Sequence, residues 1–510
     1  METPPRLTRE LISKLSDATR RGVEMPSPAM LDLPERVVQF GTGAFLRGFA
    51  EYFIDSANRR GSFNGSVVAV SSTGTTRDTT LNEQDGLFTL VIQGLENGVS
   101  SQRCRVVSAL RRALSARDEW DAVLAIARDP SIELVISNTT EAGIALDAAD
   151  AFDANPPRSF PAKLTRFLAE RGRAFEYDPA RGLIVLPCEL IERNGDTLRR
   201  LVGELVSRWS LGPEIERWID ENVVFCNTLV DRIVPGGVSS AEDKRLESEL
   251  GFHDALLTSC EPYALFAIQG DEQLRERIGF ADSDARIVVT PDIEPYHQRK
   301  VRLLNGGHTI IVPAALLAGL ETVRDACEDE RIGVLLRRAM LDEIVPSLTA
   351  PDSVEFAREV LARFANPYIH HSLIDITLHG TAKMRVRVVP SIVEYVGRTG
   401  RTPTALAFGF AAHLAFMRGE QHDERRAAGL PVPVDPAGAR IRAAWERADV
   451  ASDAGLMALV RELCADTTLW GTDLSGVGEF GEAVGNHLSR IVRQGIVAAL
   501  DDYLAERAVI

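Results

Sequence analysis

The 510-residue chain lacks the features that define several common protein classes. Its six cysteines include no CxxC pair and no close histidine partner, which disfavours a zinc site and a disulfide framework. No stretch reaches the roughly 18 consecutive apolar residues of a membrane span, and the start, METPPRLTRELISKL, has no signal-type apolar core. A net charge of -16 opposes attraction to nucleic acid or to an anionic membrane. We therefore expect a cytoplasmic protein without metal, nucleic-acid or membrane partners, whose oligomeric state is open and for which a monomer is plausible.

The composition and the length are those of an ordinary globular protein with two domains. Hydrophobic residues make up 45% and charged residues 25%, and the chain exceeds the roughly 250 to 300 residues at which one core stops growing. Up to about residue 295, short β-branched runs alternate with helical patterns, which predicts a doubly wound parallel sheet, and β-rich runs become rare afterwards. We expect strands at 36–40, 66–70, 133–137 and 182–187, helices at 45–54, 118–129, 162–171, 313–329 and 405–419, and a loop at 429–440.

Two glycines occupy the turn after the first expected strand, in QFGTGAFLRGF. Gly41 and Gly43 have the spacing of a dinucleotide-binding turn, in which one glycine permits the bend and the next lets pyrophosphate approach the helix N-terminus. Leu46 replaces the usual third glycine. We assign Phe45, where the helical pattern begins, and Arg47, which can reinforce phosphate binding, to the same predicted site. The alternative is a structural strand-helix turn with a solvated arginine.

The end of the second expected strand does not select the coenzyme. SSTGTT at 71–76 lacks the acidic residue that would hold the adenosine ribose of NAD. It also lacks an arginine cluster for the 2′-phosphate of NADP, with Arg77 the nearest candidate. Local chemistry thus leaves NAD and NADP both open.

The segment KVRLLNGGHT, residues 300–309, gathers three groups able to handle a proton. At about 100° per residue, Asn305 lies roughly 140° around a helix from Lys300, and His308 lies about 80° from it, between the two. An amine, an amide and an imidazole on one side can hold a hydroxyl or carbonyl and move its proton. The adjacent pair Gly306 and Gly307 indicates a close approach to the backbone, for which a flat ring would fit. The alternative is an amphipathic helix with a snorkelling lysine, a capping asparagine and a core histidine.

Several motifs in order resemble the mannitol dehydrogenase family of polyol-type long-chain dehydrogenases, from about residue 35 to 420. The resemblance implies an N-terminal Rossmann-type doubly wound domain, 1–295, and an all-helical C-terminal domain, 296–510, that carries substrate and catalytic groups. It also implies an active site between the domains and metal-independent hydride transfer with a nicotinamide cofactor, which we expect to be NAD. The motifs are GTGAFLRGF, QDGLFTLVIQG, SNTTEAGI, PCELIERNGDTL, NTLVDRIVP, KVRLLNGGHT and FANPYIHHSL with HGTAKMRVRVVP.

The resemblance assigns catalytic roles to the three residues of the 300–309 segment. Lys300 matches the general acid/base, Asn305 the amide that steadies the developing alkoxide, and His308 the group that orients the reacting oxygen. These roles are physically sensible, because hydride addition builds negative charge on oxygen, which a proton donor and preorganised hydrogen bonds stabilise.

Further residues are assigned by the same resemblance. Asp231 and Lys383 match substrate-contacting positions, while Asn138 and Glu141 fall on the nicotinamide side. Mannitol-type members have an asparagine where this chain has Leu190, so we take Asn194 as the nearest amide able to bind substrate in its place.

The sequence KMRVR indicates that the substrate is an acid. A carboxylate favours an Arg or Lys partner, and Lys383, Arg385 and Arg387 alternate here, with Arg302 near the catalytic lysine. We include Arg387 in the predicted substrate site, although surface charge is the alternative for any single arginine. We therefore expect NAD-dependent reduction of a keto sugar acid. The alternatives are a related sugar-acid reductase or polyol dehydrogenase, an isomerase or lyase that retains NAD, and a non-catalytic nicotinamide sensor.

Overall fold

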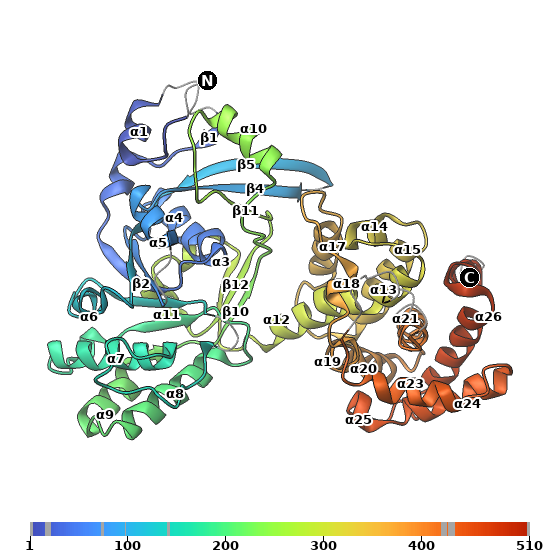
Figure 1. Cartoon of the computed structure of the whole chain (residues 1–510). Helices are drawn as coiled ribbons and strands as arrows, with labels where there is room; N and C mark the ends of the chain where they lie inside the picture. The colour runs from blue at the N-terminus through green and yellow to red at the C-terminus, as the bar shows by residue number, and fades with distance from the viewer. Residues whose placement is uncertain are drawn as a thin grey trace. The chain divides into compact units, whose positions relative to one another are not determined.

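The computed structural model describes residues 4–15, 22–72, 76–96, 98–139, 143–419, 426 and 434–506. The chain divides into two compact units, Met1–Ile293 and Glu294–Ile510 (Figure 1). No helix among the described residues is long and apolar enough to cross a membrane.

A six-stranded sheet, parallel throughout, forms the centre of the first unit (Figure 1). Counted along the chain, its strands have the spatial order 3-2-1-4-5-6 of the Rossmann fold, so the direction of winding reverses between the first and the fourth. The four strands expected from the sequence all belong to this sheet. In spatial order the strands are β6 (Leu110–Ser115), β3 (Ser66–Ser71), β2 (Glu35–Phe40), β7 (Leu134–Ser137), β8 (Ile184–Pro187) and β9 (Val224–Phe225).

Alternate residues of these strands enter two different cores, because successive side chains of a strand point to opposite faces. Val37 packs with Phe49 and Phe53, whereas Val38 and Phe40 pack with helices on the other face. Burial on both faces explains why these strands read as continuous apolar runs. The helices of this unit are α1 (Arg9–Lys14), α3 (Ala44–Gly48), α4 (Ala50–Arg59), α5 (Thr76–Glu83), α6 (Trp120–Ala127), α7 (Phe160–Ala174), α8 (Asn194–Arg208), α9 (Pro213–Asn222), α10 (Ser240–Leu250) and α11 (Glu272–Ile278).

Two smaller sheets accompany the parallel sheet, and the sequence patterns did not predict them. One has the order β1-β5-β4-β11 and contains a long antiparallel pair, β4 with β5. The other has the order β10-β12-β13. Their strands are β1 (Val23–Glu24), β4 (Phe88–Glu96), β5 (Val99–Val107), β11 (Thr258–Cys260), β10 (Thr228–Asp231), β12 (Leu265–Gln269) and β13 (Ile287–Thr290).

The second unit is helical and has no strand among its described residues. The helix expected at 313–329 is in fact two, because the chain leaves the helical path after Leu317 and restarts at a capping box on Thr322. Of the loop expected at 429–440, residues 429–433 lie outside the described residues and a helix begins at Gly438. The elements are α12 (Glu294–Arg299), η5 (Lys300–Asn305), α13 (Gly306–Leu317), α14 (Val323–Glu328), α15 (Ile332–Arg337), η6 (Arg338–Ile344), α16 (Val345–Ser347), α17 (Ser353–Phe364), α18 (Leu373–Ile376), α19 (Gly380–Arg387), α20 (Val389–Thr399), α21 (Thr404–Phe416), α23 (Gly438–Arg447), α24 (Asp453–Cys464), α25 (Thr467–Trp470) and α26 (Phe480–Glu506).

Candidate active site

A groove of about 920 Å³ opens in the first unit at the point where the strand order reverses. Gly41, Gly43 and Asn138 line it, and they follow the two neighbouring strands β2 and β7. Open α/β sheets bind ligands in this crevice, outside the carboxyl ends of the strands. Gly41 has φ of 124°, and a Cβ there would lie 3.0 Å from the Asn138 carbonyl oxygen. The bend and the close approach both explain why a glycine occupies this position.

Protein donors bind the carbonyl groups of this turn. Gln39 Nε2 donates to the Gly41 carbonyl at 2.9 Å, and Arg47 Nη1 donates to the Thr42 carbonyl at 2.8 Å. Among the described residues, the N–H groups of Thr42 and Gly43 donate to no protein acceptor. Successive free N–H groups in a turn are suited to an anion such as pyrophosphate, so the turn fits the dinucleotide expected from its sequence.

Arg47 and Phe45 pack behind the turn and do not line the groove. Arg47 is buried, and besides Thr42 it donates to Thr258 Oγ1 at 3.1 Å. Burial lowers the pKa of its guanidinium. Phe45 stacks on Phe49 with ring centroids 5.0 Å apart. Neither residue lines the groove, and we assign both a role in shaping the turn instead of the direct phosphate contact expected for Arg47.

Asn138 and Glu141 were assigned to the nicotinamide side. Asn138 follows β7, and its Nδ2 donates to the Cys188 carbonyl at 2.7 Å, which fixes the amide in the wall of the groove. Glu141 lies outside the described residues. Sequence reasoning missed Glu189, a buried acid that accepts from the Thr139 N–H at 2.8 Å and from Ser137 Oγ at 3.1 Å. Burial raises the pKa of this carboxyl, whose only sequence signal was its place in the PCEL motif.

Asn194 has internal partners where a substrate contact was expected. Its Nδ2 donates to the carbonyl groups of Pro187 and Glu189, at 2.9 Å and 3.1 Å, and its Oδ1 accepts from the Thr228 N–H at 2.9 Å. The side chain is 1% exposed. Because the amide is saturated inside the fold, we correct its role to joining the ends of β8 and β10. Asp231, the last residue of β10, is buried in the same unit.

Lys300 and Asn305 are the first and last residues of a π-helical turn in the second unit. This turn joins α12 to α13 without a break, and the Gly306 N–H donates to the Val301 carbonyl, five residues back. Closing a turn over five residues brings positions five apart nearer to one face than an α-helix does. The angle around the helix axis between Lys300 and Asn305 is therefore smaller than the value estimated for an α-helix. Such turns are frequent at functional sites.

The glycine pair after Asn305 permits close packing against other helices. A Cβ on Gly306 would lie 3.0 Å from the Arg387 carbonyl oxygen on α19. A Cβ on Gly307 would lie 3.2 Å from the Met340 sulfur and 3.5 Å from the ring of Phe364. The expected close approach is thus made by neighbouring helices, one of which supplies a flat ring.

His308 is a buried imidazole with an unpaired nitrogen. Its ring stacks on Phe364, with centroids 3.9 Å apart, and meets the ring of His371 nearly at a right angle at 4.9 Å. Nε2 is buried and has no hydrogen-bond partner among the described residues. Burial lowers the pKa of His308 well below its usual value, and the positive charges of nearby basic residues lower it further. A neutral imidazole with one uncommitted nitrogen is suited to hold a substrate oxygen.

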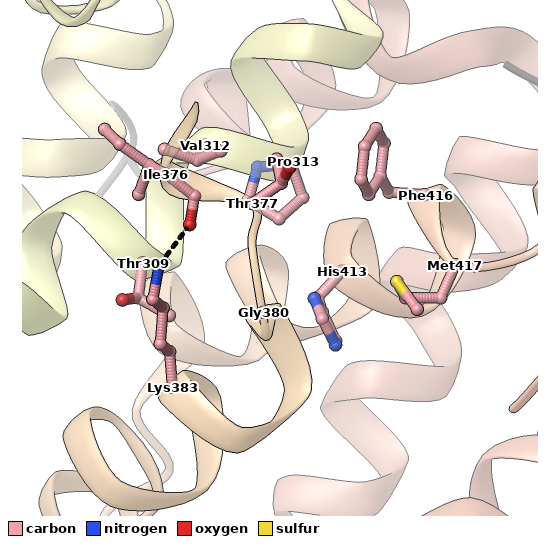
Figure 2. Close-up of a pocket in the computed structure, with 10 residues that line it drawn as sticks. All are labelled: Thr309, Val312, Pro313, Ile376, Thr377, Gly380, Lys383, His413, Phe416 and Met417. Carbon is pink, nitrogen blue, oxygen red and sulfur yellow. Dashed lines mark hydrogen bonds between the residues drawn. The ribbon is translucent and has the colours of Figure 1, made fainter. Parts of the chain in front are cut away.

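Three basic side chains lower the pKa of His308 through their charge, and two of them are on α19. Arg387 Nη1 reaches Thr309 Oγ1 at 3.4 Å, and Lys383 Nζ donates to the Ile376 carbonyl at 2.8 Å (Figure 2). Burial lowers the pKa of both. The charge of Arg363, on α17, also lowers the pKa of His308. Despite the charge of -16 for the whole chain, the surroundings of His308 are locally basic.

His371, Arg363 and Phe364 are residues that sequence reasoning missed. All three belong to, or immediately precede, the motif FANPYIHHSL, so the motif carried a signal without indicating which residue mattered. Burial lowers the pKa of His371. No group of three or more histidine, cysteine, aspartate or glutamate residues is placed to hold a metal ion in the described part of the chain.

A Rossmann-type sheet with a groove at its switch point, together with a helical unit that carries a lysine, an amide and a neutral histidine, defines a two-domain oxidoreductase. Two family models match the chain: the mannitol dehydrogenase Rossmann domain over residues 35–280 and the mannitol dehydrogenase C-terminal domain over residues 292–492. The chain belongs to the mannitol dehydrogenase family.

Two curated relatives are similar to this chain over nearly its whole length. It is 39% identical over 474 residues to an altronate oxidoreductase of Yersinia enterocolitica, covering 92% of this chain and 97% of that one. It is 37% identical over 470 residues to an altronate oxidoreductase of Bacillus subtilis, covering 92% and 95%.

Two solved structures share the fold. The mannitol 2-dehydrogenase of Pseudomonas fluorescens, in a ternary complex with NAD and D-mannitol, matches with a TM-score of 0.67 at 22% identity, covering 98% of this chain and 99% of that one. A substrate-free D-sorbitol dehydrogenase matches with a TM-score of 0.76 at 23% identity, covering 97% and 100%.

Proposed function

We propose that the protein is an NAD-dependent oxidoreductase that reduces D-tagaturonate to D-altronate, reversibly, in the breakdown of hexuronates. The observation that carries the proposal is the pair of basic side chains on α19, Lys383 and Arg387, of which Arg387 reaches Thr309, the neighbour of the buried His308. A polyol carries no charge to pair with Lys383 and Arg387, whereas a sugar acid carries a carboxylate, which Arg and Lys bind through charge-assisted hydrogen bonds. The names of the curated relatives support the same substrate.

The two units divide the work. The groove along Gly41, Thr42 and Gly43 holds the coenzyme through backbone N–H groups, and NAD supplies the hydride chemistry when it is bound. Asn138 forms part of the groove wall on the nicotinamide side. In the second unit, Lys300 donates a proton to the substrate oxygen during reduction and accepts it during oxidation.

Asn305 and His308 bind that oxygen while its charge develops. The Asn305 amide donates a hydrogen bond to the alkoxide, and His308 Nε2, which no described protein group satisfies, orients the oxygen. Preorganised donors of this kind stabilise the transition state more than the ground state, because the negative charge is larger there. Lys383 and Arg387 bind the carboxylate, and Asp231 accepts from a hydroxyl group of the sugar chain.

The protein is proposed to act in the cytoplasm, on a small sugar acid. The six cysteines are free thiols, five of them buried, as expected in a reducing compartment.

A substrate panel tests the function. Purified protein is mixed with NADH or NADPH and with tagaturonate, fructuronate or fructose, and the loss of absorbance at 340 nm is followed. We expect stoichiometric loss with NADH and tagaturonate, and slower reaction in every other combination. Faster reduction of fructuronate or fructose would overturn the substrate, and a preference for NADPH would overturn the coenzyme. Product without net NADH loss would instead identify an isomerase or lyase that retains NAD.

A further inference from the structure

Behind the coenzyme turn, the buried amide that donates to the Gly41 carbonyl is bound in turn to a buried acid. Gln39, on β2, is completely buried, and Glu51, on α4, is 1% exposed. Gln39 Nε2 donates to two acceptors: the Gly41 carbonyl at 2.9 Å and Glu51 Oε1, also at 2.9 Å. One amide group thus connects the turn to the acid.

We propose that Gln39 and Glu51 are positioning residues for the coenzyme: Glu51 orients the Gln39 amide, and Gln39 holds the Gly41 carbonyl away from the groove. The inference rests on the proposed function, since it takes the groove as the coenzyme site. Gln39 touches no ligand and acts through the backbone of the turn.

The peptide groups of the turn have fixed orientations because each carbonyl accepts a hydrogen bond from a protein donor. Gln39 binds the carbonyl of Gly41, and the buried Arg47 binds that of Thr42. A peptide unit points its N–H opposite to its C=O. Holding the Gly41 carbonyl therefore also directs the Thr42 N–H, which belongs to the same peptide and has no acceptor among the described residues.

Glu51 is an unusual residue for such a place. A lone buried carboxylate costs free energy, and an apolar residue would fill the space without that cost. Burial raises the pKa of Glu51 to about 7, while the Gln39 hydrogen bond and the charge of Arg47 oppose the rise. Gln39 Oε1 and Glu51 Oε2 are both buried and lack hydrogen-bond partners among the described residues. The acid therefore stands here at an energetic cost, and such costly features cluster at functional sites.

The inference is tested with four variants: Gln39→Met, Glu51→Met, the double variant, and Glu51→Gln. Methionine keeps the length of the side chain and removes its hydrogen bonds. The Kd for NADH is measured by fluorescence titration, and kcat is measured at saturating NADH and sugar acid. Gln273→Met, at an exposed position of α11, is the matched control.

Gln39→Met is expected to raise the Kd for NADH about tenfold and to leave kcat at saturation within about twofold, because losing one partner of a buried carbonyl weakens the turn but not the chemistry. Glu51→Met is expected to raise Kd by a smaller factor. The double variant is expected to raise it less than the product of the two, because both act on one contact. Glu51→Gln keeps an acceptor for Gln39 and should bind NADH as the wild type does.

Three results would overturn the inference: an unchanged Kd in Gln39→Met, a fall in kcat that parallels the rise in Kd, or Glu51→Gln binding as weakly as Glu51→Met. Wild-type protein that binds NADH but reduces no sugar acid would refute the proposed substrate and leave this inference standing on Kd alone. Wild-type protein that does not bind NADH would refute both.

Discussion

The two units of this protein differ in the chemical groups that form their candidate sites: mainly backbone groups in the first unit and side chains in the second. In the first unit, the candidate site consists mainly of backbone: a bend at Gly41, carbonyl groups that accept hydrogen bonds from buried side chains, and N–H groups available to a ligand. In the second unit the candidate site consists of side chains on η5, α13 and α19. A backbone site tolerates many side chains as long as the turn keeps its shape. A side-chain site fails with the loss of a single functional group.

The largest effect is expected from the side-chain site. Lys300→Ala should lower kcat by about a thousandfold, because general acid catalysis contributes roughly 10² to 10⁴. The Kd for NADH should stay within about twofold. Steady-state assays at saturating substrate and a titration with NADH measure the two quantities. Lys244→Ala, at an exposed position of α10, is the control and should retain full activity; near-normal turnover of Lys300→Ala would remove the lysine from the mechanism.

The basic surroundings of His308 should determine which substrate is chosen. Lys383→Met and Arg387→Met are each expected to raise KM for tagaturonate by about 10-fold to 100-fold, the value of one charge-assisted hydrogen bond. Rates on the uncharged fructose should change little. Arg385→Met, exposed on the same helix, is the matched control. Equal losses on the acid and on the ketose would show that these residues do not recognise a carboxylate.

The backbone site should be sensitive to a single methyl group. Gly41→Ala places a Cβ 3.0 Å from the Asn138 carbonyl oxygen at a φ of 124°, which L-residues rarely adopt. We expect the Kd for NADH to rise about tenfold, with little change in KM for the sugar acid. Gly203→Ala, in α8 with open space where its Cβ would lie, should bind NADH normally. A Gly41→Ala enzyme with unchanged coenzyme affinity would contradict the assignment of the turn.

The sequence predicted the strands of the parallel sheet better than the breaks and turns within helices, for reasons visible in particular residues. Buried parallel strands such as β2 and β8 are continuous apolar runs bounded by turn residues, and these are strong local signals. The break at Phe49, which divides the expected helix 45–54 into α3 and α4, depends on packing and left no such signal. The π-helical turn at Lys300 was not predicted either, because the same side chains serve an α-helix equally well.

Residues that looked alike in the sequence also differ in their burial and in their hydrogen-bond partners. Arg47 and Asn194 were expected to meet ligands, but Asn194 is saturated by internal hydrogen bonds, and Arg47 is buried with protein acceptors for its Nε and Nη1 groups. His371 was not singled out, although its ring lies 4.9 Å from that of His308. Contacts between segments far apart in the chain decide such cases, and no local pattern reports them. The roles of Lys300, Asn305 and His308 stay predictions.

The smallest expected effect is on thermal stability, through Glu51, the buried acid behind the coenzyme turn. Burial raises the pKa of Glu51 to about 7 from an ordinary 4.5. The folded state therefore holds a proton that the unfolded state releases between these values, so Glu51 lowers the free energy of unfolding as pH rises through this window. Glu51→Gln should raise the thermal midpoint by a few degrees at pH 8 and leave it unchanged below about pH 4.5. A difference of the same size at both pH values would point to packing instead of ionisation.

The most direct test of the central claim, that an amine at position 300 transfers the proton, is chemical rescue. Lys300→Ala is assayed with NADH and tagaturonate while ammonium, methylamine or ethylamine is added at constant pH and ionic strength. We predict that turnover rises with amine concentration and saturates, whereas the Kd for NADH does not change. No restoration by any of these amines would contradict the account.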